Sequence, residues 1–167
     1  MLIPLKEQIR QMPNFPISGV NFLDISPILS APDSFQVMLS QMADLVDWTK
    51  IDVVIGIESR GFILGAALAA RHIKGFIPCR KAGKLPPPII SESYQLEYGS
   101  ATLEMQAGHG RALIVDDVLA TGGTLQATIN LAEKSGYQVN DLLVLIDIQK
   151  LNKLKFNGQP VKSLFKF

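Results

Sequence analysis

The sequence LIVDDVLATGGT occupies residues 113–124 and is the most informative part of the chain, because its chemistry changes twice. An apolar, partly β-branched run ends at two adjacent acids, Asp116 and Asp117, and a glycine-rich turn then opens a helical pattern. A buried strand that leads through a turn into a helix is typical of α/β proteins with a mainly parallel sheet. We therefore expect the acids where the strand leaves the sheet, at the carboxyl edge where such folds bind ligands.

The turn after the acids has the composition of a phosphate-binding site. Gly122 and Gly123 permit a tight turn with exposed N–H groups, and the helix N-terminus adds partial positive charge. Thr121 and Thr124 add hydroxyl donors. The acids can accept hydrogen bonds from sugar hydroxyls or bind hydrated Mg²⁺, so a ribose 5-phosphate satisfies both halves of the segment. The alternative is a capped helix start after an acidic turn.

The rest of the chain alternates strand and helix patterns, without a repeat or a dividing linker, which predicts one domain over residues 1–167. Helices are expected over residues 5–12, 34–49 (with Asp33 as N-cap), 61–74 and 124–135. Strands are expected over residues 51–57, 75–79, 103–105, 111–115 and 142–148, the third of them antiparallel. Residues 14–32 and 80–99 are expected to be irregular, and the stretch after residue 148 is ambiguous.

Two other glycine patterns do not fit a known phosphate motif. Residues 56–61 have the glycine spacing of a P-loop, but Phe62 and Ile63 stand where lysine and serine or threonine are required. Gly108 and Gly110 precede a strand rather than a helix, which excludes the dinucleotide-binding fingerprint.

Composition predicts a soluble, cytoplasmic protein. The net charge of +1 gives no strong field for nucleic acid or an anionic membrane. Cys79 is the single cysteine, which excludes an internal disulfide and fits a reducing compartment. The longest apolar run, residues 62–70, is far shorter than the roughly 20 residues that cross a bilayer. Residues 1–20 lack the pattern of a signal peptide.

Residues 113–124 resemble the phosphoribosyl pyrophosphate (PRPP) motif of the type I phosphoribosyltransferases. Four further blocks, in family order, resemble the adenine branch of that family. They are a base-binding loop (FPISGVNFLDISP, 15–27), a pyrophosphate loop (ESRGF, 58–62), a basic segment (RKAGKLP, 80–86) and a mobile hood (SYQLEYG, 93–99). Ala120 also favours this branch, because the hypoxanthine/guanine branch usually has an aspartate there. The connection over residues 107–110 is shorter than usual, so we expect a tighter turn with the site unaffected.

The resemblance implies the type I phosphoribosyltransferase fold, a central, mainly parallel sheet flanked by helices with a mobile β hood, in a homodimer. Within the domain, residues 13–32 would form the base-binding loop, 80–106 the basic segment and hood, and 113–124 the PRPP-binding motif. The implied reaction joins adenine to PRPP, gives AMP and pyrophosphate, and serves purine salvage. Mg²⁺ would be carried by PRPP, with no metal ligands from the protein.

The resemblance also implies roles for individual residues. Asp116 and Asp117 would bind the ribose hydroxyls and stabilise the cationic sugar in the transition state. The 5′-phosphate would be bound by Ala120, Thr121, Gly122, Gly123 and Thr124. Pyrophosphate would be bound by Glu58, Ser59 and Arg60, with a cis peptide between Glu58 and Ser59, and by the cations Arg80, Lys81 and Lys84. Arg80 would act across the dimer interface.

The base would be recognised from two segments. Phe22 and Val118 would sandwich the purine, the Asn21 backbone would accept from its 6-amino group, and Arg60 would reach N3. Glu97 would transfer a proton at the base, carried in by closure of the hood, and Tyr98 would shield the site. His72 and His109 show no metal-ligand spacing and are expected to be structural or solvated.

Three alternatives stay open at this stage. The first is a phosphoribosyltransferase for hypoxanthine or xanthine, against which Ala120 and the Phe22 loop argue. The second is a non-catalytic PRPP-sensing regulator, for which residues 1–12 are too short to add a DNA-binding module. The third is an interaction module that uses the Lys- and Phe-rich residues 150–167, which more simply form an amphipathic edge.

Overall fold

The computed structural model describes residues 4–96 and 99–167, which form two compact units, Met1–Gln41 and Met42–Phe167. Within the ranges that the structure describes, no helix is long and apolar enough to cross a bilayer.

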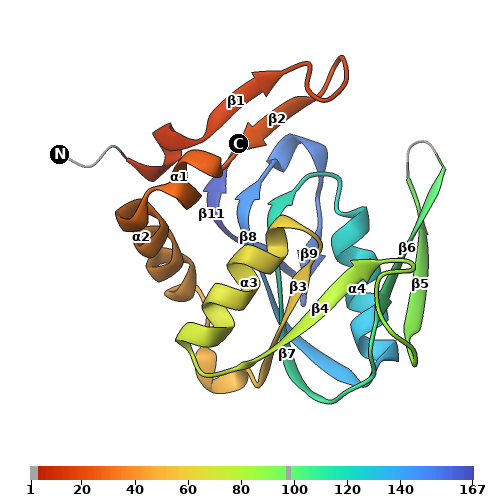
Figure 1. The fold of residues 1–167 in the computed structure, drawn as a ribbon. Coiled ribbons are helices and arrows are strands. Elements are labelled where there is room, and N and C mark those ends of the chain that lie inside the picture. Colours follow the sequence, from red (N-terminus) through yellow and green to blue (C-terminus); the bar gives the residue numbers. More distant parts are fainter. Residues whose placement is uncertain (1–3, 97–98) are drawn as a thin grey trace. The chain divides into compact units, whose positions relative to one another are not determined.

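The first unit contains an antiparallel hairpin (Figure 1). Its elements are η1 (Leu5–Gln8), β1 (Arg10–Pro13), β2 (Asn21–Asp24), α1 (Ser26–Ser30) and most of α2 (Pro32–Ala43). Arg10 lies opposite Asp24 in the ladder, and the two side chains form an ion pair. Near the turn, the rings of Phe15 and Phe22 meet edge to face with their centroids 5.3 Å apart.

The prediction of a helix over residues 5–12 and an irregular stretch over 14–32 was wrong. The turn between the strands has a cis Phe15–Pro16 peptide and a left-handed Gly19, whose N–H donates to Asn14 Oδ1 at 2.9 Å. This turn returns the chain so that residues 21–24 pair with 10–13. Cross-strand hydrogen bonds therefore replace the helix that the local pattern favoured.

The second unit is built on a seven-stranded sheet in the order β11-β8-β7-β3-β4-β6-β5. Its elements are η2 (Trp48–Lys50), β3 (Val53–Ile57), α3 (Arg60–Arg71), β4 (Gly75–Lys81), β5 (Ile90–Gln95), β6 (Ser100–Met105), β7 (Gly110–Leu119), α4 (Gly123–Lys134), β8 (Tyr137–Asp147), η3 (Gln149–Leu151), β9 (Lys155–Phe156), β10 (Gln159–Pro160) and β11 (Lys162–Lys166). The strands from β11 to β4 pair in parallel, and β6 pairs antiparallel with both of its neighbours, β4 and β5. The predicted α/β class with a mainly parallel sheet is confirmed.

The central pair β3 and β7 carries the core of this unit. Ile55 and Ile114 lie opposite each other in the ladder and are fully buried. The crossovers β3–α3–β4 and β7–α4–β8 leave this pair in opposite directions. Because such crossovers are right-handed, α3 and α4 cover opposite faces of the sheet (Figure 1).

Strand β7 continues past the point where the sequence predicts its end. It pairs with β3 only as far as Val115, but with β8 as far as Leu119, so Asp116 lies opposite Val144. The expectation that this strand ends at residue 115 was therefore wrong. The acids lie within β7, on the stretch where its ladder with β3 has already stopped.

Three other expectations need correction. The helix expected over residues 34–49 ends at Ala43, and Asp47 caps the separate turn η2 by accepting from Thr49 N at 3.2 Å. Asp33 is not the N-cap, because α2 begins at Pro32, a residue whose fixed φ suits a first helical position. Residues 80–99 were expected to be irregular, but residues 90–95 form strand β5, which pairs with β6. The stretch after residue 148, whose structure the sequence left open, contains β11, a parallel edge strand next to β8.

The short connection before β7 lies against the C-terminal end of α4. Gly108 N donates to Ser135 O at 2.9 Å. Gly136 has a left-handed backbone (φ +99°), and a Cβ on it would lie only 2.4 Å from Gly108 O. A glycine at position 136 is therefore needed for both its backbone conformation and this close approach.

We expect Gly136→Ala to lower the free energy of unfolding by about 2–4 kcal/mol, since it adds a backbone clash to the cost of a left-handed alanine. Gly158→Ala is the matched control, because Gly158 also has a positive φ (+76°) but no atom within 4 Å of a Cβ. It should cost only about 1–2 kcal/mol. Urea unfolding midpoints measure both, and equal losses would contradict the role of the Gly108 contact.

Candidate functional site

The candidate site lies where β3 and β7 end side by side in the second unit. Their connections diverge there, which makes this edge the topological switch point, the usual ligand crevice of an open α/β sheet. The first turn of α3 approaches β7 very closely. A Cβ on Gly61 would lie 2.9 Å from Val115 O and 3.0 Å from Asp116 Oδ1, so only glycine permits this approach.

The two acids in β7 have different environments. Asp117 is buried, and its Oδ2 lies 2.6 Å from Arg60 Nε in an ion pair. Asp116 Oδ1 accepts from Asp117 N at 2.8 Å. Burial of the carboxyl, and next the charge of Asp117, raise the pKa of Asp116 well above its ordinary value. The pair therefore offers one ion-paired carboxylate and one carboxyl group that retains a proton more readily.

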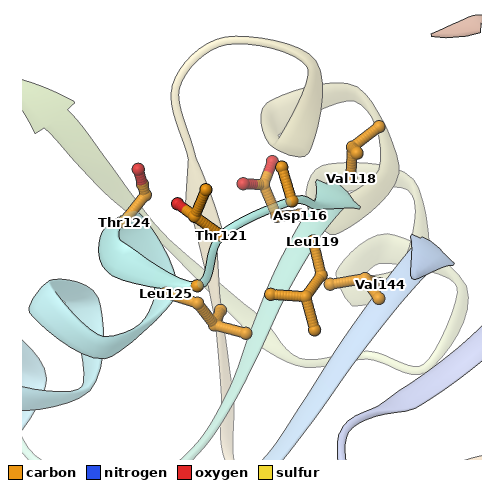
Figure 2. Close-up of a pocket in the computed structure, with 9 residues that line it drawn as sticks. Asp116, Val118, Leu119, Thr121, Thr124, Leu125 and Val144 are labelled. Carbon is orange, nitrogen blue, oxygen red and sulfur yellow. The ribbon is translucent and has the colours of Figure 1, made fainter. Parts of the chain in front are cut away.

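The turn after β7 leads directly into the N-terminus of α4. Gly122 has a left-handed backbone (φ +94°) at the N-cap of α4, and its carbonyl accepts from Gln126 N at 2.9 Å. The free N–H groups of the first helical turn are therefore available to an anion. Figure 2 shows Asp116, Thr121 and Thr124 on the same side of the turn. A cavity of about 100 Å³ opens there, lined by Asp116, Val118, Leu119, Ala120, Thr121, Gly122, Thr124, Leu125 and Val144.

Residues from the segment after β8 hold this turn by hydrogen bonds and packing. Asn152 Nδ2 donates to Ala120 O at 2.9 Å and to Asp147 Oδ1 at 3.0 Å, and Asn152 Oδ1 accepts from Leu154 N at 3.2 Å. The Leu154 side chain lies next to Gly122, at 3.5 Å from a Cβ built there. Sequence reasoning missed Asn152, because a lone asparagine in an ambiguous stretch carries no motif.

The loop after β3 gathers cations around one carboxylate. The Glu58–Ser59 peptide is cis, which confirms that prediction. The Glu58 side chain is only 9% exposed and accepts from Lys84 Nζ at 2.7 Å, Lys81 N at 3.0 Å and Arg80 Nε at 3.3 Å. Burial by itself raises the pKa of Glu58, but these donors, Lys84 first, outweigh it and lower the pKa to about 2. Glu58 is therefore ionised at neutral pH and holds Arg80 and Lys84 beside the loop.

A second buried acid shapes the basic segment. Glu104 in β6 is 7% exposed, and its Oε2 accepts from Gly83 N at 3.0 Å. Gly83 has a positive φ (+82°), so the chain turns tightly between Lys81 and Lys84. The sequence offered a signal here, since an acid between the apolar residues of a strand needs a buried partner.

Not every predicted site residue joins this group. Asn21 and Phe22 lie in β2, in the first unit, so their roles stay predictions. Glu97 and Tyr98 lie outside the described residues. Val118 lines the cavity beside the acids.

Two further titratable side chains, those of Cys79 and His72, are held by contacts of their own. Burial raises the pKa of Cys79 to about 12, so its thiol is not a nucleophile at neutral pH. Its Sγ lies 3.8 Å from Thr128 Oγ1. His72 stacks on Trp48 with the ring centroids 3.8 Å apart, and burial lowers its pKa.

We expect Asn152→Ala to lower the free energy of unfolding by about 1–3 kcal/mol, because buried Asp147 loses a donor. It should also weaken binding of ribose 5-phosphate, since the turn loses its support at Ala120. Urea unfolding and calorimetric titration measure the two effects. Gln126→Ala, which removes an exposed amide from α4, should change neither by more than a small amount, and an equal response of both variants would count against the support of the turn.

The chain matches the phosphoribosyl transferase domain family over residues 28–166. It is 50% identical over 163 residues to the adenine phosphoribosyltransferase of Bdellovibrio bacteriovorus, which covers 98% of this chain and 99% of that protein. The crystal structure of adenine phosphoribosyltransferase from Rhodothermus marinus is 42% identical, with a TM-score of 0.86 and coverage of 98% and 96%. That of the Giardia lamblia enzyme complexed with 9-deazaadenine is 34% identical, with the same TM-score and coverage. These similarities confirm the type I phosphoribosyltransferase fold, and the chain belongs to the phosphoribosyltransferase family, among the adenine phosphoribosyltransferases.

Proposed function

We propose that this chain transfers the phosphoribosyl group of PRPP to N9 of adenine and releases AMP and pyrophosphate. One observation carries the proposal: the switch point joins an anion-binding turn, an acidic pair and a cluster of cations. These three features correspond to the three parts of PRPP, namely its 5′-phosphate, its ribose and its pyrophosphate. Similarity to adenine phosphoribosyltransferases supports adenine as the acceptor.

The acidic pair acts on the ribose. Asp116 and Asp117 bind the 2′- and 3′-hydroxyls, while the turn at residues 120–124 binds the 5′-phosphate. As the bond from C1′ to pyrophosphate breaks, positive charge develops on the sugar, and the ionised carboxylate of Asp117 stabilises it. Arg60 keeps that carboxylate oriented through their ion pair.

The cation cluster acts on the leaving group. Arg80 and Lys84 are already oriented by Glu58, and Lys81 is exposed beside them. Pyrophosphate gains negative charge as it leaves, so these cations and the N–H groups of residues 58–60 bind it more tightly in the transition state than in the ground state. In a homodimer, Arg80 serves the neighbouring site, as the family resemblance implies.

The base is selected by one backbone acceptor. Phe22 and Val118 sandwich the purine, Arg60 binds N3, and the Asn21 backbone accepts from the 6-amino group. Hypoxanthine has a 6-oxo group instead, which leaves that acceptor unpaired at a cost of about 1–3 kcal/mol. Glu97 moves a proton at the base when the hood closes, and Tyr98 shields the site from water.

Magnesium accompanies PRPP in this proposal. Asp117 is already ion-paired with Arg60, and the raised pKa of Asp116 favours its neutral form, so the pair is poorly suited to hold a bare divalent cation. In the described part of the chain, no three His, Cys, Asp or Glu side chains gather as metal ligands. Mg²⁺ bound by the phosphates, hydroxyls and water neutralises part of the pyrophosphate charge. The reaction would serve purine salvage in a reducing cytoplasm.

The direct test is AMP formation from adenine, PRPP and Mg²⁺, in a panel that includes hypoxanthine, guanine and xanthine. We expect kcat/KM for adenine to exceed that for hypoxanthine by about 5- to 150-fold, as the unpaired acceptor implies. Removal of Mg²⁺ with a chelator should abolish turnover. Faster turnover of hypoxanthine than of adenine would refute the choice of base.

Asp117→Asn tests the acidic pair, because it removes the charge and keeps the shape. We expect kcat to fall by about 100-fold or more, since the developing positive charge loses its stabilising carboxylate. Asp141→Asn is the matched control: Asp141 lies in neighbouring β8 and also forms an ion pair, with Lys162. It should keep kcat near that of the unaltered chain, and an undiminished rate for Asp117→Asn would refute the role of Asp117.

A further inference from the structure

The first strand of the hood region, β5, is attached to helix α4 by side chains from one of its faces. Glu92 forms an ion pair with Lys134 and accepts from Asn130 Nδ2 at 3.3 Å. Two residues on, Tyr94 Oη lies 3.0 Å from Thr124 Oγ1. Residues two apart on a strand project to the same side, so all these contacts belong to the face of β5 that meets α4.

The position of the Tyr94 hydroxyl is fixed by packing. Its ring packs against the buried core of the second unit, and its Cδ2 lies 3.8 Å from a Cβ built on Gly123. The tyrosine therefore lies directly beside the first turn of α4. It was not among the residues predicted from the sequence, where only the hood motif marked this stretch.

Thr124 has a single hydroxyl proton to donate, while its oxygen can accept. A bound phosphate oxygen can only accept from that hydroxyl. When a phosphate occupies the turn, the Thr124 proton must point to it, and the Tyr94 hydroxyl is then free to donate to Thr124 Oγ1. Tyr94 then donates to Thr124 and Thr124 donates to the phosphate, and hydrogen bonds in such a chain strengthen one another.

We propose that Tyr94 is a positioning residue that orients the Thr124 hydroxyl toward the 5′-phosphate and so ties phosphate binding to docking of the hood on α4. The inference rests on the proposed function of the turn. It adds a link between two subsites, because Tyr94 comes three residues before Glu97 in the sequence. A phosphate bound at residues 120–124 then favours contact of β5 with α4. Pyrophosphate, which binds at residues 58–60 and 80–84 under the proposed function, does not act through the Tyr94 hydroxyl.

The test is Tyr94→Phe, which keeps the ring and removes only the hydroxyl. We expect KM for PRPP and the inhibition constant of ribose 5-phosphate to rise together, by about 2- to 12-fold, the range of one net hydrogen bond. Inhibition by pyrophosphate should not change, because its subsite lies elsewhere. A merely structural effect would weaken both inhibitors or lower kcat alone, and either result would overturn the proposal, as would unchanged ribose 5-phosphate inhibition.

Two further variants complete the test. Ser93→Ala removes a hydrogen bond of 2.8 Å to Thr102 on the opposite face of β5, and it should leave ribose 5-phosphate inhibition unchanged. In a Thr124→Val background, Tyr94→Phe should have no further effect, since both changes break one chain of hydrogen bonds. Additive effects would overturn the proposal. Failure of the unaltered chain to form AMP would instead refute the proposed function, so the two failures are distinguishable.

Discussion

The parallel pairing of β3 with β7 is the constraint on which the rest of the second unit depends. Its register places Gly56 opposite Val115, so the loop after β3 begins beside the acidic end of β7. The two crossovers then diverge, and neither helix covers this edge of the sheet. Gly61 permits the start of α3 to approach β7 closely, because a Cβ on this residue would lie only 3.0 Å from Asp116 Oδ1. Any side chain at position 61 would push the start of α3 away from β7 and so disrupt the site.

The charges of the site are paired with one another before any ligand binds. Glu58 holds Lys84 and Arg80, and Arg60 holds Asp117. Unpaired charges at this depth would be costly, so the pairing keeps the cations and acids in place. Because the pKa of Glu58 is about 2, its carboxylate is charged at neutral pH and attracts the cations. A pyrophosphate carries more negative charge than one carboxylate, so under the proposed function it would compete with Glu58 for these cations.

The sequence predicts best what local chemistry decides. The core strands, the glycine turn and the start of α4 combine strong local signals with burial, and all lie close to their expected positions. In the first unit, β1 was mistaken for the end of a helix and β2 for part of an irregular stretch, because these strands pair only once the turn at Gly19 brings them together. The length of β7 was underestimated for a similar reason. Its polar end is held by the ladder with β8, which no pattern within β7 reveals.

The same distinction separates the site residues that a motif can identify from those that it cannot. Asp117 or Thr124 would touch a ligand directly, so their chemistry must suit that ligand and leaves a recognisable pattern. Asn152 and Tyr94 act through another residue, on Ala120 and Thr124 respectively, and come from segments far away in the chain. Any side chain with a suitable donor at that place could do the same, so their type alone indicates nothing. Asn152 lies in no motif, and its contact with Ala120 is what identifies it. Tyr94 lies within the hood motif, but only the tertiary contact shows that it reaches Thr124. We expect a substitution at Asn152 to alter binding while every motif residue stays intact.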